Sequence, residues 1–168
     1  KYRNNSVRET KSLDLDYIMR ATPNDWCADP HIVETREKTW LFYENVKNGK
    51  GSIEVAEIND DCTISKPHVI LQDNYHYSYP FVFSCKGKWY MIPETSDRSE
   101  VRLYKSSSFP YKWEIEKVLL RGKYVDTTPF LYEGKAFILT FEICSGSEQV
   151  HPYIFKIKGQ ELEQLKWI

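Results

Sequence analysis

The chain has 168 residues, of which 28% are charged, and a formal net charge of −1. This length suits one well-buried domain. The 23 basic residues are balanced by 24 acidic ones, which excludes the large positive surplus typical of proteins that bind nucleic acid or anionic membranes. Aromatic residues make up 15% of the chain, and such rings fill β cores or line partly polar ligand sites.

The N-terminal residues 1–24 are expected to form a strand or an extension, and they contain no hydrophobic segment of a signal peptide. No apolar run reaches the ~20 residues that span a bilayer, so we predict no membrane span. The compartment stays open, with a slight preference for the cytoplasm. The cysteines form no CxxC pair, and we expect free, mostly buried thiols. They are Cys27, Cys62, Cys85 and Cys144.

Three segments of the chain share one plan. They are "DPHIVETREKTWLFYEN", "YPFVFSCKGKWYMIPET" and "TPFLYEGKAFILTFEI". In each, a proline precedes apolar residues, a short polar turn follows, and a second apolar run ends near a glutamate. Three prolines are spaced by 50 and 49 residues, and three glutamates by 50 and 48. They are Pro30, Pro80 and Pro129, and Glu44, Glu94 and Glu142.

Further strands fit the same period. Residues 51–58, 99–107 and 151–159 alternate apolar and polar side chains, as half-buried strands do, and 67–73 and 113–122 read as fourth strands. Four antiparallel strands in about 50 residues are typical of a β-propeller blade. A β-sandwich also has many short strands, but it does not explain the repeat.

We therefore predict an all-β fold, a β-propeller of the five-bladed type with about three blades in this chain. The blades are expected at about 25–74, 75–123 and 124–168. Three blades alone leave open sheet edges and apolar faces. We expect either a missing remainder of the propeller or self-association to cover them.

The segment "NYHYSYPFVF" (74–83) places rings, hydroxyls and an imidazole directly before a core strand. Equivalent inner strands of a propeller converge on one axis, so this segment, Asp29 and Asp126 are expected around one pocket. Rings there stack on a sugar face and hydroxyls bond its edge. The candidate substrate-binding residues are Trp26, His76, Tyr77, Tyr79 and Glu94.

Each candidate also has a purely structural explanation. Asp29 and Asp126 could cap turns, since Asp before or near Pro commonly does. The three repeated glutamates could bond backbone groups between blades, and His76 could be a hydrogen-bonded core residue. His31 and His68 are assigned to structural or surface roles. The histidines show no metal-ligand spacing, so no metal and no cofactor are predicted.

The segments "WCADPHIV", "KTWLFYE", "YHYSYPFVFSCKGKWYMIPETS" and "VDTTPFLYEGKAFIL" resemble the five-bladed propellers of glycoside hydrolase family 43 and its relatives. They are more similar to the N-terminal propeller domain of glucosamine inositolphosphorylceramide transferases. The resemblance covers about residues 25–145. "SYPFVF…WY…IPET" is its most specific part.

The hydrolase resemblance implies roles for two aspartates. Asp29, in an Asp-Pro motif, matches the general base, and Asp126 matches a second Asp that tunes the pKa of the acid and holds the substrate. Asp126 is followed by Thr127 and not by the Pro common in the hydrolases. The general acid of that family is a Glu on the fourth blade, and it cannot be assigned in this chain.

Two functions are therefore compared. One is a non-catalytic module that binds carbohydrate in polysaccharide or glycoconjugate synthesis or processing. The other is an inverting glycoside hydrolase that uses Asp29 as general base with an acid outside this chain. The unassigned acid and the likeness to the transferase-associated propellers favour the module, with a carbohydrate or glycoconjugate as its partner.

Overall fold

The structure is a computed structural model that describes residues 25–143, 150–158 and 161–165. The expected N-terminal extension, residues 1–24, lies outside the described residues, and so does Cys144. Among the described residues, one 3-10 turn, η2 (Ser96–Arg98), is the single helical element, and all other regular structure is strand.

The strands form three four-stranded antiparallel sheets, each in simple chain order. The first sheet contains β1 (Trp26–Glu34), β2 (Thr39–Lys47), β3 (Lys50–Ile58) and β4 (His68–Leu71). The second contains β5 (Ser78–Cys85), β6 (Lys88–Glu94), β7 (Glu100–Ser108) and β8 (Lys112–Arg121). The third contains β9 (Tyr124–Tyr132), β10 (Lys135–Ile143), β11 (Val150–Lys158) and β12 (Glu161–Leu165).

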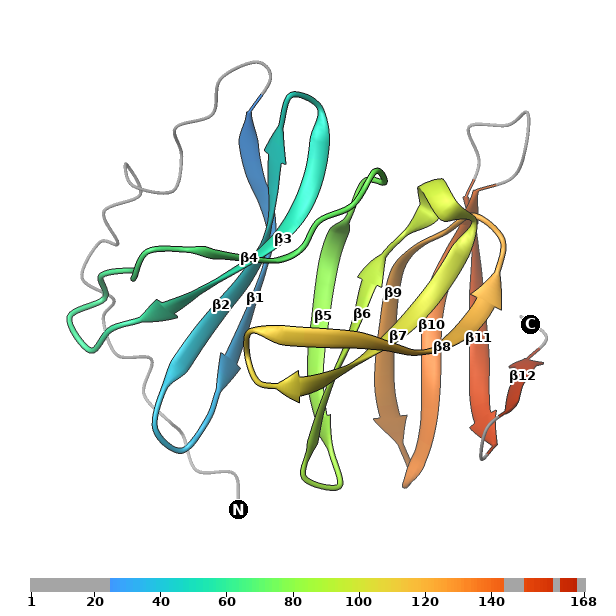
Figure 1. The fold of residues 1–168 in the computed structure, drawn as a ribbon. Coiled ribbons are helices and arrows are strands. Elements are labelled where there is room, and N and C mark those ends of the chain that lie inside the picture. Colours follow the sequence, from blue (N-terminus) through green and yellow to red (C-terminus); the bar gives the residue numbers. More distant parts are fainter. Residues whose placement is uncertain (1–24, 144–149, 159–160, 166–168) are drawn as a thin grey trace.

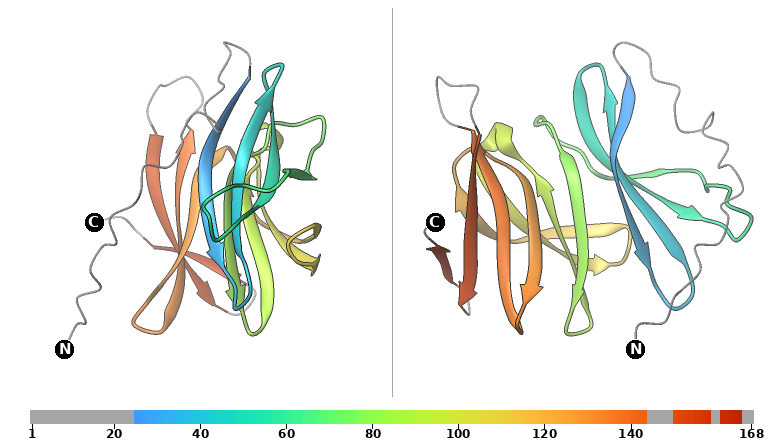
Figure 2. Two further views of the ribbon diagram at one scale, coloured as in Figure 1. Left: turned by 90° about the vertical axis from the view of Figure 1, so that its left-hand side faces the viewer. Right: turned by 180° about the vertical axis from the view of Figure 1, so that it is seen from behind.

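The three sheets follow one another across the molecule in chain order (Figures 1 and 2). Their first strands meet, since β1 contacts β5 and β5 contacts β9. This arrangement is that of successive propeller blades, with the first strand of each blade innermost. The predicted all-β propeller fold is confirmed, and the described residues form three four-stranded blades.

Tight turns join the first two strands of the second and third blades. Lys86 and Gly87 connect β5 to β6, and Glu133 and Gly134 connect β9 to β10, all with positive φ. Two-residue turns with both residues left-handed match the twist of a hairpin, and Gly adopts the second position without strain. The conformation of the polar turns "SCKGK" and "EGK" thus follows from the residues of the turns themselves.

The main hydrophobic core lies between the first and second sheets. Phe42 on β2 is fully buried, and its ring lies 6.2 Å from the Trp113 ring on β8 and 5.9 Å from the Phe109 ring in the β7–β8 turn. Ile53 and Met91 are also fully buried in this cluster. Burial of these side chains joins the two blades and holds their inner strands at a defined distance.

Apolar side chains remain exposed on the third blade. Leu131 and Tyr132 on β9 expose 79% and 62% of their surface. The expectation that further chain or a second molecule covers the open blade faces stays a prediction. Among the described residues, no helix has the length and apolar character needed to cross a membrane.

Candidate functional site

Each innermost strand is interrupted at the same place. The pairing of β1 with β2, of β5 with β6 and of β9 with β10 shifts by one residue near the start of the strand. The residue at each irregularity has positive φ: 51° at Asp29, 45° at Tyr79 and 52° at Asp126. Bulges of this kind re-aim a side chain and are common beside active sites. Asp29, Tyr79 and Asp126 therefore occupy equivalent positions in successive blades.

The register differs from the sequence repeat in the third blade. Pro30 and Pro80 directly follow the bulge residues, but Thr127 holds that place in β9, and Pro129 lies two residues further on. The alignment of Pro129 with the other two prolines is therefore wrong. Asp126 nevertheless shares its backbone position and conformation with Asp29.

The repeated glutamates are also out of register in the third blade, by one residue. In each blade, one residue of the second strand pairs with the last regular position before the bulge. It is Glu44 (opposite Ala28) in the first blade, Glu94 (opposite Ser78) in the second and Phe141 (opposite Val125) in the third. Glu142 pairs with Tyr124 instead. Because neighbouring residues of a strand face opposite sides, Glu142 is not the third member of the Glu44 and Glu94 series.

Carboxylates join neighbouring blades. The backbone N–H of Tyr79 donates to Oδ2 of Asp29 at 3.1 Å, and the backbone N–H of Asp126 donates to Oε2 of Glu94 at 3.5 Å. The other oxygen of Glu94 accepts from the Ser96 hydroxyl at 3.0 Å. Asp29 and Glu94 thus have structural roles at blade interfaces whatever else they do.

Four carboxyl groups influence one another here. Burial raises the pKa of Glu94, and the charges of Asp126 and Asp29 add to that rise. Burial also raises the pKa of Asp126, again with a contribution from Asp29. Burial raises the pKa of Glu44, against the lowering effect of its His76 hydrogen bond, while Asp29 raises it further. Asp29 is the member that acts on all three others.

A small hollow of about 130 Å³ opens at the bulges of the first two blades. It is lined by Asp29, Pro30, His31, Tyr79, Pro80 and Phe81. The His31 ring lies 4.7 Å from the Phe81 ring, and its Nε2 is 2.8 Å from the Val82 carbonyl oxygen. The Tyr79 hydroxyl lies 2.9 Å from Thr128 Oγ1, across on β9.

Sequence reasoning missed three residues of this site: His31, Phe81 and Thr128. A signal for the first two was present, since each lies two residues beyond a bulge residue, and alternate residues of a strand share a face. The sequence predicts a structural or surface role for His31, but the residue lines the hollow. Thr128 lies two residues beyond the bulge residue Asp126 and so carried the same signal, but its contact with Tyr79, 49 residues away, does not follow from the sequence.

Of the five expected substrate-binding residues, only Tyr79 is among those that line the hollow. Tyr77 is only 4% exposed and belongs to the core cluster, where its hydroxyl lies 3.2 Å from that of Tyr104. Its predicted place at the pocket rim is wrong, because it lies just before β5 and its side chain packs in the core beside Tyr104 of β7. Trp26 lies at the start of β1, is 40% exposed, and is not among the residues that line the hollow.

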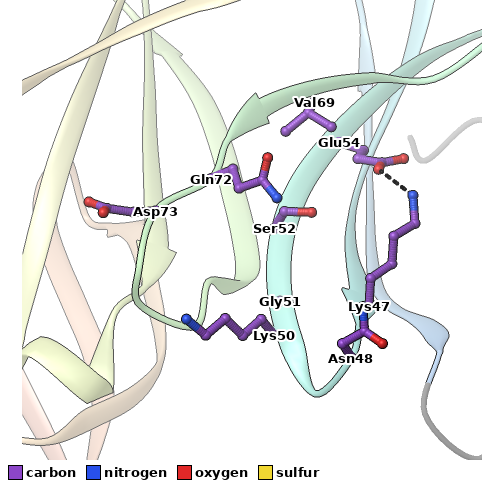
Figure 3. Close-up of a pocket in the computed structure, with 9 residues that line it drawn as sticks. All are labelled: Lys47, Asn48, Lys50, Gly51, Ser52, Glu54, Val69, Gln72 and Asp73. Carbon is purple, nitrogen blue, oxygen red and sulfur yellow. Dashed lines mark ion pairs between the residues drawn. The ribbon is translucent and has the colours of Figure 1, made fainter.

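A larger hollow of about 470 Å³ lies on the first blade, beside the β2–β3 turn and the segment after β4 (Figure 3). Its lining residues are Lys47, Asn48, Lys50, Gly51, Ser52, Glu54, Val69, Gln72 and Asp73. The Glu54 carboxylate already accepts from Tyr43 Oη at 2.7 Å and Asn45 Nδ2 at 2.6 Å. This hollow contains none of the bulge residues, and we do not favour it as the main site.

Within the described ranges, no group of three or more His, Cys, Asp or Glu side chains is arranged to hold a metal ion. Cys27, Cys62 and Cys85 are free thiols, and all three are exposed. The expectation of mostly buried thiols is therefore wrong for them, because two lie at strand ends and one in the β3–β4 loop.

Residues 16–158 match the family described as glucosamine inositolphosphorylceramide transferase 1, N-terminal. The chain belongs to this family. Glucosamine inositolphosphorylceramide transferase 1 of Oryza sativa subsp. indica is 34% identical over 115 residues, which are 67% of this chain and 16% of that protein. The Arabidopsis thaliana protein of the same name is 33% identical over 115 residues, or 67% of this chain and 15% of its own length.

Solved structures that resemble this family member include glycoside hydrolases. The GH32 β-fructofuranosidase of Bombyx mori has a TM-score of 0.66 at 18% identity, covering 87% of this chain and 38% of that one. GH43B of the xyloglucan PUL of Bacteroides ovatus has a TM-score of 0.63 at 13% identity, covering 83% and 28%. At such identities the likeness shows the propeller fold. The chain spans about a sixth of the transferases that it matches.

Proposed function

We propose that this chain is a carbohydrate-binding propeller module that acts in glycoconjugate or polysaccharide synthesis or processing. The observation that carries the proposal is the equivalence of Asp29, Tyr79 and Asp126 at the bulges of three successive blades. Two carboxylates and a phenol, presented from neighbouring inner strands, offer acceptors and a ring edge to sugar hydroxyls. Family membership and the hydrolase-like fold support a carbohydrate as the partner.

The size and lining of the hollow suit part of a sugar unit. Its volume of about 130 Å³ is below the ~300–1,000 Å³ of pockets that enclose a drug-sized ligand. Pro30, Pro80 and Phe81 supply apolar surface, while Asp29, His31 and Tyr79 supply polar groups. We infer that one edge of a monosaccharide unit enters it and that the remainder of the ligand stays outside.

Glycoside hydrolysis by an inverting mechanism is the alternative. It requires an acid and a base about 6.5–9.5 Å apart, and Asp29 is a candidate base at an Asp-Pro bulge. Among the described residues we assign no general acid, since the acid that the hydrolase resemblance implies lies on a fourth blade and the described strands form three sheets. We therefore propose binding with little or no hydrolysis.

Calorimetric titration tests the proposal. The panel contains D-glucosamine, D-fructose, L-arabinose and cellotriose, chosen from the names of the relatives and structural neighbours. We expect at least one sugar to bind the wild-type chain and to bind Asp126→Asn more weakly. Asp60→Asn, which changes an exposed carboxylate of the β3–β4 loop, is the matched control and should bind normally.

Two results would count against the proposal: no panel sugar binds, or Asp126→Asn binds as wild type does. Release of the aglycone from aryl glycosides separates the two functions. Turnover that disappears in Asp29→Asn would favour the hydrolase.

A further inference from the structure

His76, in the segment between β4 and β5, lies between two groups of the first blade. Its Nδ1 accepts a hydrogen bond from the backbone N–H of Gly51 on β3, with a nitrogen-to-nitrogen distance of 3.2 Å. Its Nε2 lies 2.7 Å from Oε1 of Glu44 on β2. The backbone N–H of His76 itself donates to Oδ2 of Asp97, in η2, at 3.2 Å.

These partners determine the tautomer of the ring. A nitrogen that accepts an N–H must present its lone pair, so Nδ1 carries no proton. The ring proton then lies on Nε2 and is donated to the Glu44 carboxylate. A doubly protonated ring would point its Nδ1–H at the N–H of Gly51, donor against donor. The geometry therefore selects the neutral Nε2–H form.

Gly51 is required by space and not by backbone conformation. A Cβ added there would overlap the Tyr77 carbonyl oxygen, and it would lie 2.8 Å from His76 Nε2 and 2.9 Å from Glu44 Oε1. Separations under 3.0 Å force a shift of the neighbouring atoms. Any larger residue at position 51 therefore disturbs the contact between His76 and Glu44.

Glu44 faces the candidate site from the second strand of the blade. It is only 5% exposed, and Asp29 and Cys27 on β1 interact with it electrostatically. Glu94 on β6 and Asp126 on β9 lie beyond Asp29, which acts on both of them. Nε2 of His76 lies within hydrogen-bond distance of the Glu44 carboxylate, and this contact lowers the Glu44 pKa where Asp29 raises it.

We propose that Gly51 and His76 are positioning residues of the carbohydrate site. The Gly51 N–H selects the His76 tautomer, and His76 Nε2–H holds the Glu44 carboxylate in place beside Asp29. This hydrogen bond fixes the orientation of the Glu44 carboxylate. It thereby also fixes the charge that lies beside Asp29, a residue of the hollow. The inference rests on the proposed function for its link to sugar binding, but its geometry can be tested without any sugar.

The first test is nuclear magnetic resonance of the whole chain. Long-range nitrogen–proton spectra should show His76 as the Nε2–H tautomer, and carbon-detected titration should follow the Glu44 carboxyl group. In His76→Phe the Glu44 midpoint should move to higher pH, because the ring N–H that lowers its pKa is lost. In His76→Gln an amide N–H replaces the donor, so the midpoint should return toward the wild-type value.

His68→Phe is the matched control. His68 is an exposed histidine of β4 whose ring lies 5.1 Å from the Tyr111 ring, and its replacement should leave the Glu44 midpoint unchanged. The Nδ1–H tautomer at His76 in the wild type would overturn the proposal. So would equal midpoints in wild type and His76→Phe. The wild-type tautomer can be measured even if a variant fails to fold.

The second test links the pair to ligand binding. Gly51→Ala and His76→Phe should each weaken sugar binding about tenfold, which corresponds to one lost hydrogen bond to a charged group, and His76→Gln should bind within about threefold of wild type. Equal loss in His76→Phe and His76→Gln would overturn the positioning role. If the wild type binds no panel sugar, the proposed function fails, while the tautomer and midpoint results still decide the geometry.

Discussion

The backbone N–H of Tyr79 donates to Oδ2 of Asp29 at 3.1 Å, across the boundary between the first and second blades. One carboxylate oxygen of the candidate site therefore also joins two propeller blades. The sequence offered a pocket role and a turn-cap role for Asp29 as alternatives. In the structure, the side chain lines the hollow and bonds the neighbouring strand at the same time.

Two substitutions separate these roles of Asp29. Asp29→Asn keeps an oxygen acceptor for the Tyr79 N–H but removes the charge, so sugar binding should weaken by about 1.5–3 kcal/mol while the fold stays intact. Asp29→Ala removes the acceptor as well and should lower the free energy of unfolding by about 1–3 kcal/mol. Calorimetric titration and thermal melts measure the two effects. If Asp29→Asn lowers the melting temperature strongly and leaves affinity unchanged, Asp29 is only a structural residue.

The Tyr79 hydroxyl gives a second prediction. It lies 2.9 Å from Thr128 Oγ1, and its ring lines the hollow. Tyr79→Phe should weaken sugar binding because a polar contact is lost, and it should destabilise the fold by only about 0.5–1.5 kcal/mol, the value of one neutral hydrogen bond.

The control for Tyr79→Phe is Tyr132→Phe, which removes the hydroxyl of a tyrosine 62% exposed at the other end of β9. Both variants are titrated with the same sugar and melted under the same conditions. If Tyr79→Phe binds the sugar as tightly as Tyr132→Phe does, the Tyr79 hydroxyl is not part of the binding site.

The buried hydroxyl pair of the third blade gives a prediction on stability. Thr127 Oγ1 and Thr140 Oγ1 lie 2.8 Å apart, and Thr140 Oγ1 also donates to the Val125 carbonyl at 3.0 Å. Thr140→Val leaves the buried Thr127 hydroxyl and the Val125 carbonyl without this partner. It should cost about 1–3 kcal/mol in the free energy of unfolding.

Urea denaturation measures that cost. Thr140→Ser keeps the hydroxyl and loses only a methyl group, so it should be destabilised less, by about 1 kcal/mol. If Thr140→Ser and Thr140→Val are equally destabilised, the hydroxyl bonds contribute little and packing alone accounts for the effect.

Glu94 predicts a pH dependence of stability. Burial raises its pKa in the folded chain above the unfolded value, so the folded state binds the proton more tightly than the unfolded state does. The stabilisation from this group is therefore fully present below the unfolded pKa of about 4.3, and it is lost as pH rises through the folded pKa. Glu94→Gln does not titrate and should not show this loss.

Urea titrations between about pH 4 and pH 8 measure the free energy of unfolding of the wild type and of Glu94→Gln. The quantity that tests the prediction is the difference between the two at each pH. Glu37→Gln, an exposed residue of the β1–β2 turn, is the control and should follow the wild type. A difference between wild type and Glu94→Gln that stays constant over this pH range would contradict the prediction.

Local patterns in the sequence were enough to predict the strands and their grouping. The alternation in 51–58 and 99–107 corresponds closely to β3 and β7, and the polar turns before Lys88 and Lys135 are tight hairpins. These features depend on neighbouring residues only: side-chain alternation, β-branched content and the freedom of Gly at positive φ. The repeat of about 50 residues then indicated successive blades.

The tertiary structure alone decided how the candidate residues meet. Register placed Phe141 and not Glu142 at the position of Glu44 and Glu94, because a shift of one residue turns a side chain to the other face. Packing between blades turned Tyr77 into the core. Hydrogen bonds joined His76 to Gly51 and Glu44, residues 25 and 32 positions away. Distances of this kind are set by burial between sheets, and no local pattern in the sequence encodes them.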